Sequence, residues 1–163
     1  MPAQMTLQEL FVGELKDLFS SESQLIKALP KMVKAAKSEE LKKAFQTHLG
    51  ETEKQLDRVK QVFEIVGEKA KGELCKGMQG IVAEGQEQIE KKTGDLGLIG
   101  AGERVEHYEM ASYQSAISMA KQLGLSDAAK LLSESLQEEE NAAKLLSQLS
   151  KPALKELSTG AAA

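Results

Sequence analysis

Apolar residues recur at steps of three and four positions along four long segments of the chain, which is the spacing of amphipathic helices. The first segment follows a capping box that begins at Thr6 and continues to about Lys37, with a bend or a division expected at Pro30. Ser38 is expected to cap the second helix, which Gly67 should end. The first two segments therefore predict a helical hairpin.

A second helical hairpin is expected after a long connection. Glycines interrupt the periodic pattern over residues 68–93, which predicts a crossover that carries only one short helix, around Met78 and Ile89. Asp95 is expected to cap the third long helix, and Ser126 the fourth. Short turns join antiparallel helices, whereas a connection of about 28 residues lets the second and third helices run parallel. The pattern therefore predicts an all-α, ferritin-like four-helix bundle with a long crossover.

We expect one bundle domain over residues 1–152 and a separate C-terminal tail over residues 153–163. Pro152 lacks the N–H that a helix interior needs, so only a short helical remnant is expected beyond it, followed by disorder over residues 158–163. The composition supports a single helical domain. Of the 163 residues, 41% are hydrophobic and only 4% aromatic, which disfavours a β-sandwich or barrel.

Charge and hydropathy exclude several classes of partner. The formal net charge is −4, and both signs are interspersed along the chain, so the sequence has no basic patch for nucleic acid. No stretch approaches the roughly 20 apolar residues of a membrane span, and the first residues do not resemble a secretory signal. The lone Cys75 cannot form an internal disulfide. We therefore expect a cytoplasmic protein that binds neither membranes nor nucleic acid.

Six polar residues interrupt the apolar faces of the four helices. Glu22, for example, lies between Leu18 and Leu25 on the apolar row of the first helix. Counted from the nearest turn between helices, all six lie roughly 17 to 28 Å into helices roughly 40 Å long, so they should meet near the waist of the bundle. The six residues are Glu22, His48, Glu51, Glu106, Glu109 and Glu139.

Five carboxylates in an apolar interior need protons, partners or metal ions, because an isolated buried carboxylate is strongly unfavourable. No Lys or Arg occupies these inward positions, so a cation is the simplest partner. Two divalent ions would nearly balance the five charges. Carboxylates with one imidazole suit iron or manganese, and the pairs His48/Glu51 and Glu106/Glu109 have the i, i+3 spacing of di-metal bundles.

Four other residues have open interpretations. His107 lies one turn after Glu103 and is expected to form a surface pair with it. Tyr113 either hydrogen-bonds a metal ligand or is an ordinary core tyrosine. Glu84, in the crossover helix, is a candidate extra ligand if that helix folds back over the site. Cys75 is best explained as a small buried residue, with a redox role as the weaker alternative.

Several segments together resemble the YciF-like family of bacterial stress proteins, which are small ferritin-like proteins related in fold to rubrerythrin. The resemblance covers about residues 7 to 150 and implies a four-helix bundle, a homodimer, a di-iron or di-manganese centre and expression under stress. The segments that carry it are ELKDLFSSESQLIKALPKM, HLGETEKQLDRV, CKGMQGIVAEG, GERVEHYEMASYQSA and LLSESLQEEE.

The resemblance also implies metal ligands at the six inward positions, with two departures from the usual pattern. His48 precedes Glu51 where ferritin-like sites usually have Glu-x-x-His, and Ala142 stands where a second histidine is usual. Fewer nitrogen ligands would weaken metal binding or open a coordination position. The chain also lacks the Cys-x-x-Cys module through which rubrerythrins receive electrons, so turnover would need an external reductant.

We therefore expect a di-metal carboxylate protein of the stress response that reduces peroxide or oxidises Fe(II), with two metal ions roughly 3.5 to 4 Å apart. The alternative is a metal-independent dimeric bundle with a protective or interaction role, whose inward glutamates are protonated or solvated. A storage or DNA-protecting cage is a third possibility with little support, since the chain has no basic tail.

Overall fold

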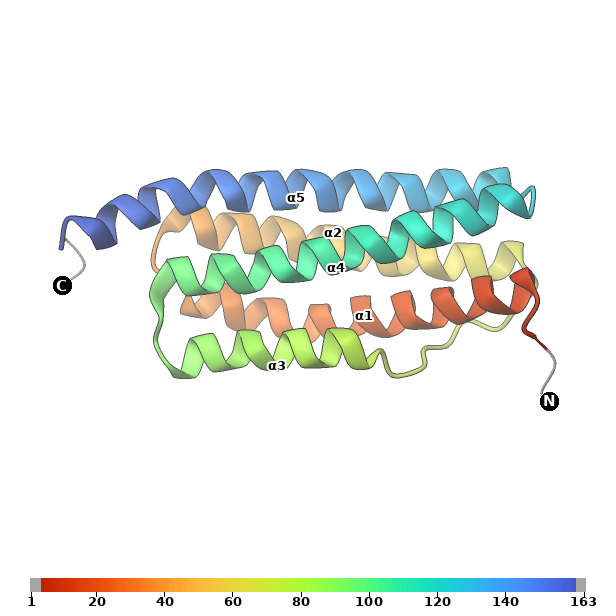
Figure 1. Ribbon diagram of the computed structural model, residues 1–163, viewed down its shortest axis with the longest axis horizontal. Coiled ribbons are helices and arrows are strands. Elements are labelled where there is room, and N and C mark those ends of the chain that lie inside the picture. The colour runs from red at the N-terminus through yellow and green to blue at the C-terminus, as the bar shows by residue number, and fades with distance from the viewer. Residues whose placement is uncertain (1–3, 161–163) are drawn as a thin grey trace.

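The computed structural model describes residues 4–160, and within this range all regular secondary structure is helical, without a strand. This confirms the predicted all-α bundle. The helices α2 and α4 run in the same direction, opposite to α1 and α5, as Figure 1 shows. Five helices follow one another along the chain: α1 (Leu7–Ala35), α2 (Glu39–Ile65), α3 (Lys76–Glu90), α4 (Gly94–Gln122) and α5 (Ser126–Ser158).

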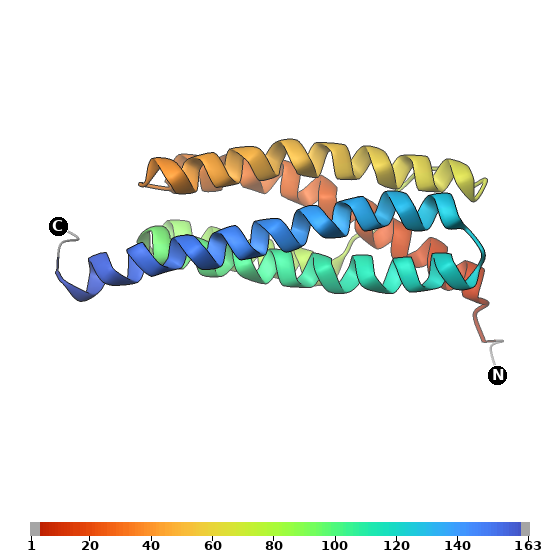
Figure 2. The ribbon, with the colours of Figure 1, turned by 90° about the horizontal axis from the view of Figure 1, so that it is seen from above.

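The four long helices form a closed ring of neighbours. Helix α1 packs against α2 and α4, and α5 packs against the same two helices from the other side (Figures 1 and 2). The short helix α3 lies outside this ring, against α1 and α4. Together with the extended segment before it, α3 returns the chain to the end at which α2 began, so that α4 starts beside the start of α2. The predicted crossover and the parallel α2 and α4 are thus confirmed.

Several helix ends agree with the sequence. Thr6 and Glu9 form both hydrogen bonds of the predicted capping box, and the Ser38 side chain caps α2. Gly67 and Gly124 have φ angles of 72° and 73°, so each ends a helix in a conformation that other residues rarely adopt. Helix α1 continues through Pro30 without a division.

The prediction that Asp95 caps α4 is wrong. Helix α4 begins at Gly94, so Asp95 lies inside its first turn. The carboxylate accepts hydrogen bonds from the backbone N–H groups of Lys37 (2.7 Å) and Ser38 (2.8 Å). These donors lack partners in the α1–α2 turn, and Asp95 therefore joins this turn to the start of α4.

The start and the end of α5 also differ from the prediction. Ser126 is the first residue of α5, and Leu125 occupies the cap position. The backbone N–H of Leu125 donates a hydrogen bond to the carbonyl of Ala120, which closes the turn between α4 and α5 without the Ser126 side chain. Helix α5 then passes through Pro152 and continues to Ser158, so the expected helical remnant is part of one continuous helix. Residues 161–163, the end of the tail expected to be disordered, lie outside the described residues.

The core consists of two apolar clusters separated along the bundle axis. One contains Phe11, Leu15, Leu18 and Phe63, and Phe63 also contacts Phe19 edge-on with ring centroids 6.4 Å apart. The other cluster contains Leu25, Phe45, Leu98 and Leu146. On each long helix, the polar positions predicted to face inward lie between residues of the two clusters. A polar layer therefore crosses the waist of the bundle.

Candidate metal centre

All four long helices contribute to the polar layer, and each does so because a polar residue replaces an apolar one on its buried row. Five of the six predicted residues are buried. The exception is Glu51, whose side chain is 29% exposed and lies at the edge of the layer. The five buried residues are Glu22 on α1, His48 on α2, Glu106 and Glu109 on α4, and Glu139 on α5.

The buried side chains form two groups of potential metal ligands. The first group is His48, Glu106 and Glu139, and the second is Glu22, Glu109 and Glu139. In each group, one ligand atom per residue lies within 4.8 Å of the others. Glu139 belongs to both groups, so a single carboxylate connects them.

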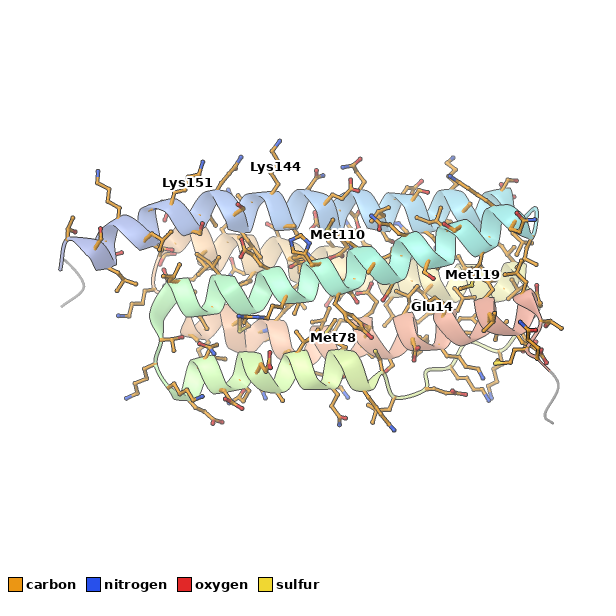
Figure 3. The ribbon with its side chains drawn as sticks, in the orientation of Figure 1. Glu14, Met78, Met110, Met119, Lys144 and Lys151 are labelled. Atoms are coloured by element: carbon orange, nitrogen blue, oxygen red, sulfur yellow. The ribbon has the colours of Figure 1, made fainter. Side chains whose placement is uncertain are left out.

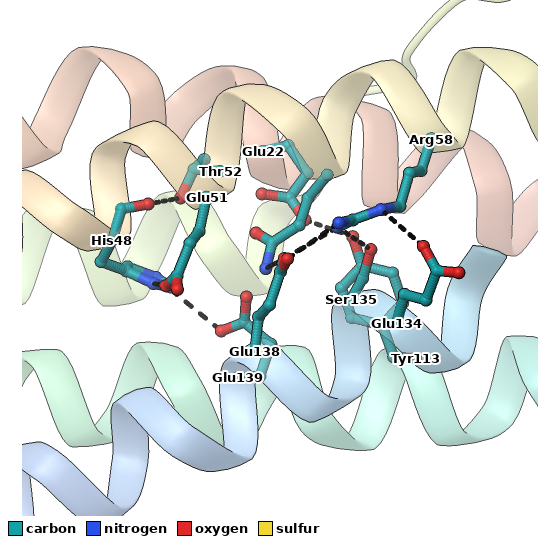
Figure 4. A network of polar contacts seen from close by, with 11 residues as sticks. Glu22, His48, Glu51, Thr52, Arg58, Tyr113, Glu134, Ser135, Glu138 and Glu139 are labelled. Carbon is teal, nitrogen blue, oxygen red and sulfur yellow. Dashed lines mark hydrogen bonds and ion pairs between the residues drawn. The ribbon is translucent and has the colours of Figure 1, made fainter.

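His48 has acidic neighbours on both ring nitrogens. Its Nε2 lies 3.2 Å from Glu106 Oε2 and 3.8 Å from Glu139 Oε2. Its Nδ1 lies 3.5 Å from Glu51 Oε2, on the outer side of the layer (Figure 4). The ring therefore directs Nε2 toward the buried acids and Nδ1 toward the most exposed member of the set.

Hydrogen bonds orient two of the acids. Ser21 Oγ donates to Glu109 Oε1 at 2.5 Å, and the Tyr113 hydroxyl donates to Glu22 Oε1. Tyr113 therefore forms a hydrogen bond with one of the predicted ligands, Glu22. Sequence reasoning missed Ser21, although its position one residue before Glu22 places it beside the buried row.

Most of the other potential ligand atoms of these buried residues have no hydrogen-bond partner within residues 4–160. A buried polar atom without a partner carries a desolvation penalty of about 1 to 3 kcal/mol, and more when it is charged. Several such atoms converging on one layer therefore favour a ligand that satisfies them together. They are Glu22 Oε2, Glu106 Oε2, Glu109 Oε2, both carboxylate oxygens of Glu139 and both ring nitrogens of His48.

Burial raises the pKa of every acid in the interior of the layer. For Glu106 and Glu109 the pKa rises to about 8, with neighbouring carboxylates adding to the effect. The pKa values of Glu22 and Glu139 also lie well above the ordinary range, for the same reasons. Burial alone would lower the pKa of His48, but Glu51 and the other acids raise it above its usual value.

A guanidinium group lies next to the layer but is paired elsewhere. Arg58 Nη1 and Nη2 donate to the two carboxylate oxygens of Glu138 at 2.7 and 2.8 Å, and Nε lies 3.4 Å from Glu134 (Figure 4). Gln55 also donates to Glu138. Among the described residues, no Lys or Arg forms an ion pair with the buried acids. Arg58 lies seven residues, or about two helical turns, after Glu51. This spacing could have placed Arg58 on the same face of α2 as Glu51.

The other sequence candidates lie away from the ligand groups. Glu84 is exposed on α3, so the structure does not bring it to the site. His107 is exposed on α4, and no ion pair with Glu103 occurs among the described residues. Cys75 is buried, as expected, with its sulfur 3.2 Å from the Tyr108 hydroxyl.

Comparison with known proteins gives the class to which this acidic bundle belongs. Residues 6–158 match the family model described as domain of unknown function DUF892. The chain belongs to this family, which confirms the expected YciF-like resemblance. None of the described helices is long and apolar enough to cross a membrane.

The relatives include protein YciF of Escherichia coli strain K12. It is 42% identical over 139 residues, which are 82% of this chain and 84% of the relative. The crystal structure of the E. coli stress protein YciF has a TM-score of 0.88 at 38% identity, covering 94% of this chain and 99% of that one. The YcfI structure from Rhodopseudomonas palustris has a TM-score of 0.85 at 35% identity, covering 88% and 94%. The chain is thus similar to the E. coli stress protein YciF along nearly its whole length.

Proposed function

We propose that the polar layer holds two divalent metal ions, iron or manganese, and that the protein uses them in a stress-related redox reaction. The observation that carries this proposal is the pair of ligand groups that share Glu139 at the centre of the bundle. His48, Glu106 and Glu139 would hold one ion, and Glu22, Glu109 and Glu139 the other. Glu51 is the candidate sixth donor at the edge of the layer.

The donor set fits these ions chemically. A ligand set of carboxylate oxygens with one imidazole suits iron and manganese. Zinc and copper are more often bound by ligand sets rich in sulfur or nitrogen. Two divalent ions bring about four positive charges against five carboxylates, and they would satisfy buried oxygens that have no hydrogen-bond partner within residues 4–160. Tyr113 and Ser21 would hold Glu22 and Glu109 in place through hydrogen bonds, as second-layer groups do in many metal sites.

The expected chemistry is reduction of peroxide with electrons from an external reductant, or oxidation of Fe(II) by oxygen or peroxide, and the two bound ions would relay the electrons. The chain itself provides access. A cavity of about 90 Å³ lies beside His48, Glu51 and Glu106, between α2 and α5, and is large enough for a molecule the size of peroxide. Glu51, half-buried beside Nδ1 of His48, is placed to exchange a proton between this cavity and the ring.

Metal content of purified and reconstituted protein tests the binding proposal. Wild type should hold two ions per chain, measured by elemental analysis, and the chelator-treated protein should melt at a lower temperature by linkage. Glu139→Ala should lose both ions because it removes the shared carboxylate, whereas Glu22→Ala should affect one. Glu140→Ala is the matched control, because Glu140 neighbours Glu139 on α5 and its side chain accepts a hydrogen bond from Gln137 instead of joining the ligand groups.

Peroxide consumption and Fe(II) oxidation by the loaded protein, with an external reductant for the peroxide assay, test the reaction. Two bound ions without turnover would leave a metal-binding protein and remove the enzymatic role.

The raised pKa values of Glu106 and Glu109 favour one rival, a metal-independent bundle with protonated acids at neutral pH. This rival predicts that chelators leave the melting temperature unchanged. The homodimer that the family resemblance implies stays a prediction, which sedimentation would test.

A further inference from the structure

A second, larger cavity approaches the polar layer from another side. It has a volume of about 360 Å³ and lies between α1, α3 and α4. This volume is within the range of pockets that bind small organic molecules. Small residues line the space: Ala28 on α1, Gly85 on α3 and Ala101 on α4. A Cβ added at Gly85 would make an ordinary van der Waals contact, 3.7 Å from the Cβ of Ala101, so α3 and α4 leave room there for one methyl group.

The walls of this cavity are mainly aliphatic, and it reaches the polar layer at Glu106. Leu25, Leu29, Val82 and Val105 are among the lining residues, and the buried Glu106 is the acid that lines it. Glu106 also lines the small cavity on the α2 and α5 side. The same carboxylate is therefore approached by an apolar cavity from one side and by a smaller, more polar one from the other.

Charge at the opening distinguishes this cavity further. Apart from Glu106, its charged lining residues are Lys27 and Lys31, which lie one turn apart on α1 and are exposed. Neither lysine forms an ion pair within the described part of the chain. The cavity thus combines two unpaired cations at the opening with an apolar interior, a combination that complements a molecule with an anionic head and an aliphatic body.

We propose that this cavity binds an aliphatic carboxylate, a fatty acid of medium chain length. Its carboxylate would lie at Lys27 and Lys31 and its chain would extend along the apolar walls toward Glu106. Glu106 is the one lining residue that belongs to the ligand groups, and the fatty-acid carboxylate would lie at the lysines instead, so binding does not require metal. The inference therefore goes beyond the proposed redox function and can be tested on metal-free protein.

Titration calorimetry with hexanoate, octanoate and decanoate tests the site, using the full chain in the presence of a chelator. Burial of each added methylene should tighten Kd about fourfold until the cavity is full. Decylamine has the same chain with the opposite charge and should bind at least about tenfold more weakly than decanoate. Raising the salt concentration should reduce this difference, because the lysines are exposed.

Two variants with matched controls locate the site. Ala28→Phe places a ring in the cavity from a half-buried position and should abolish decanoate binding, whereas Ala143→Phe, at a half-buried position on α5, should leave it unchanged. The double variant Lys27→Gln/Lys31→Gln should remove the preference for decanoate over decylamine.

The charge control is Lys144→Gln/Lys151→Gln. Both side chains extend from α5 away from the other helices, as Figure 3 shows. Circular dichroism and melting curves verify that each variant is folded.

Four results would overturn the proposal: the absence of saturable binding, an affinity independent of chain length, equal affinities for decanoate and decylamine, or unchanged binding by Ala28→Phe. A further one comes from sedimentation. If wild type is a dimer and Ala28→Phe a monomer, a second copy of the chain covers this surface and the fatty acid does not. Because calorimetry is done without metal, failure of the metal-binding test would leave the result on this cavity interpretable.

Discussion

In the metal-free protein, the free energy of unfolding should decrease as the pH rises from about 5 to about 8. Glu106 and Glu109 have pKa values raised to about 8 by burial in the folded chain. In the unfolded chain both carboxyls are hydrated and titrate near 4.3, the ordinary value for glutamate. Between these two limits, the folded state therefore binds more protons than the unfolded state.

The sign and the size of the effect follow from proton linkage. Each carboxyl that is protonated in the folded chain and ionised in the unfolded chain lowers the free energy of unfolding by about 1.4 kcal/mol per pH unit. Below about pH 4 and above the folded pKa of about 8, the contribution becomes constant. The raised pKa values of Glu22, Glu139 and His48 act in the same direction. The total slope should thus exceed that of a single group.

Urea denaturation in the presence of a chelator, at several pH values between about 5.5 and 8, measures this slope. Glu106→Gln removes one titrating group and should reduce the slope by about 1.4 kcal/mol per pH unit. Glu53→Gln is the control, because Glu53 is on the same bundle but exposed to water, and it should leave the slope unchanged. Added Mn²⁺ should stabilise the protein increasingly as the pH rises, because the ion binds the ionised carboxylates. A flat profile for metal-free wild type would refute the reasoning, since it would mean that the acids are ionised and hydrated in the folded chain.

Three further predictions concern residues around the layer. Tyr113→Phe removes the hydrogen bond to Glu22 and should weaken metal binding about 10- to 100-fold, as measured by competition with a chelator; unchanged affinity would argue against an orienting role. Arg58→Gln breaks the double hydrogen bond to Glu138 and should lower the free energy of unfolding by about 2 kcal/mol in urea without changing the metal content. Asp95→Ala removes the acceptor for two backbone N–H groups ahead of α2 and should lower that energy by about 1 kcal/mol at neutral pH. Because these bonds lower the pKa of Asp95 despite its partial burial, wild type should lose the same contribution in acid, below about pH 4.

The fold was predictable because the information for it is local. Apolar residues at helical spacing and the long glycine-interrupted connection determined the number and direction of the long helices. The errors occurred where tertiary contacts decide. Asp95 lies one residue inside α4, and its carboxylate accepts hydrogen bonds from the turn between α1 and α2. No local sequence pattern indicates this contact. The expectation that Pro152 ends the regular helix failed because a proline removes only one backbone donor, and α5 continues past it.

The candidate site was predictable in its composition but not in its detail. A charged residue on the apolar row of a helix indicates a buried polar position, and this inference does not require knowledge of the neighbouring helices. Glu22 and Glu139 illustrate it. Whether a side chain reaches the centre depends on the rotation of its helix, which sequence periodicity gives only approximately, so the partial exposure of Glu51 was not foreseen. The hydrogen bonds of Ser21 and Arg58 join pairs of helices, so the sequence indicates the faces on which the two residues lie but not the partners that they bind.

The position of the polar layer between two apolar clusters has a consequence for folding. Each cluster contains large buried side chains from several helices, such as Phe11 and Phe63 on one side and Leu41 and Leu98 on the other. Burying one such side chain stabilises the folded chain by about 1.5 to 3 kcal/mol. The clusters can therefore hold the four helices together while the acids between them carry protons, and metal binding would add stability to a bundle already formed. This differs from small metal domains that are unfolded without their ion. A chelator-treated chain should accordingly keep its helical circular dichroism and a cooperative urea transition at about pH 5.5, where the acids are protonated; loss of the transition there would show that the metal ions, and not the apolar clusters, maintain the fold.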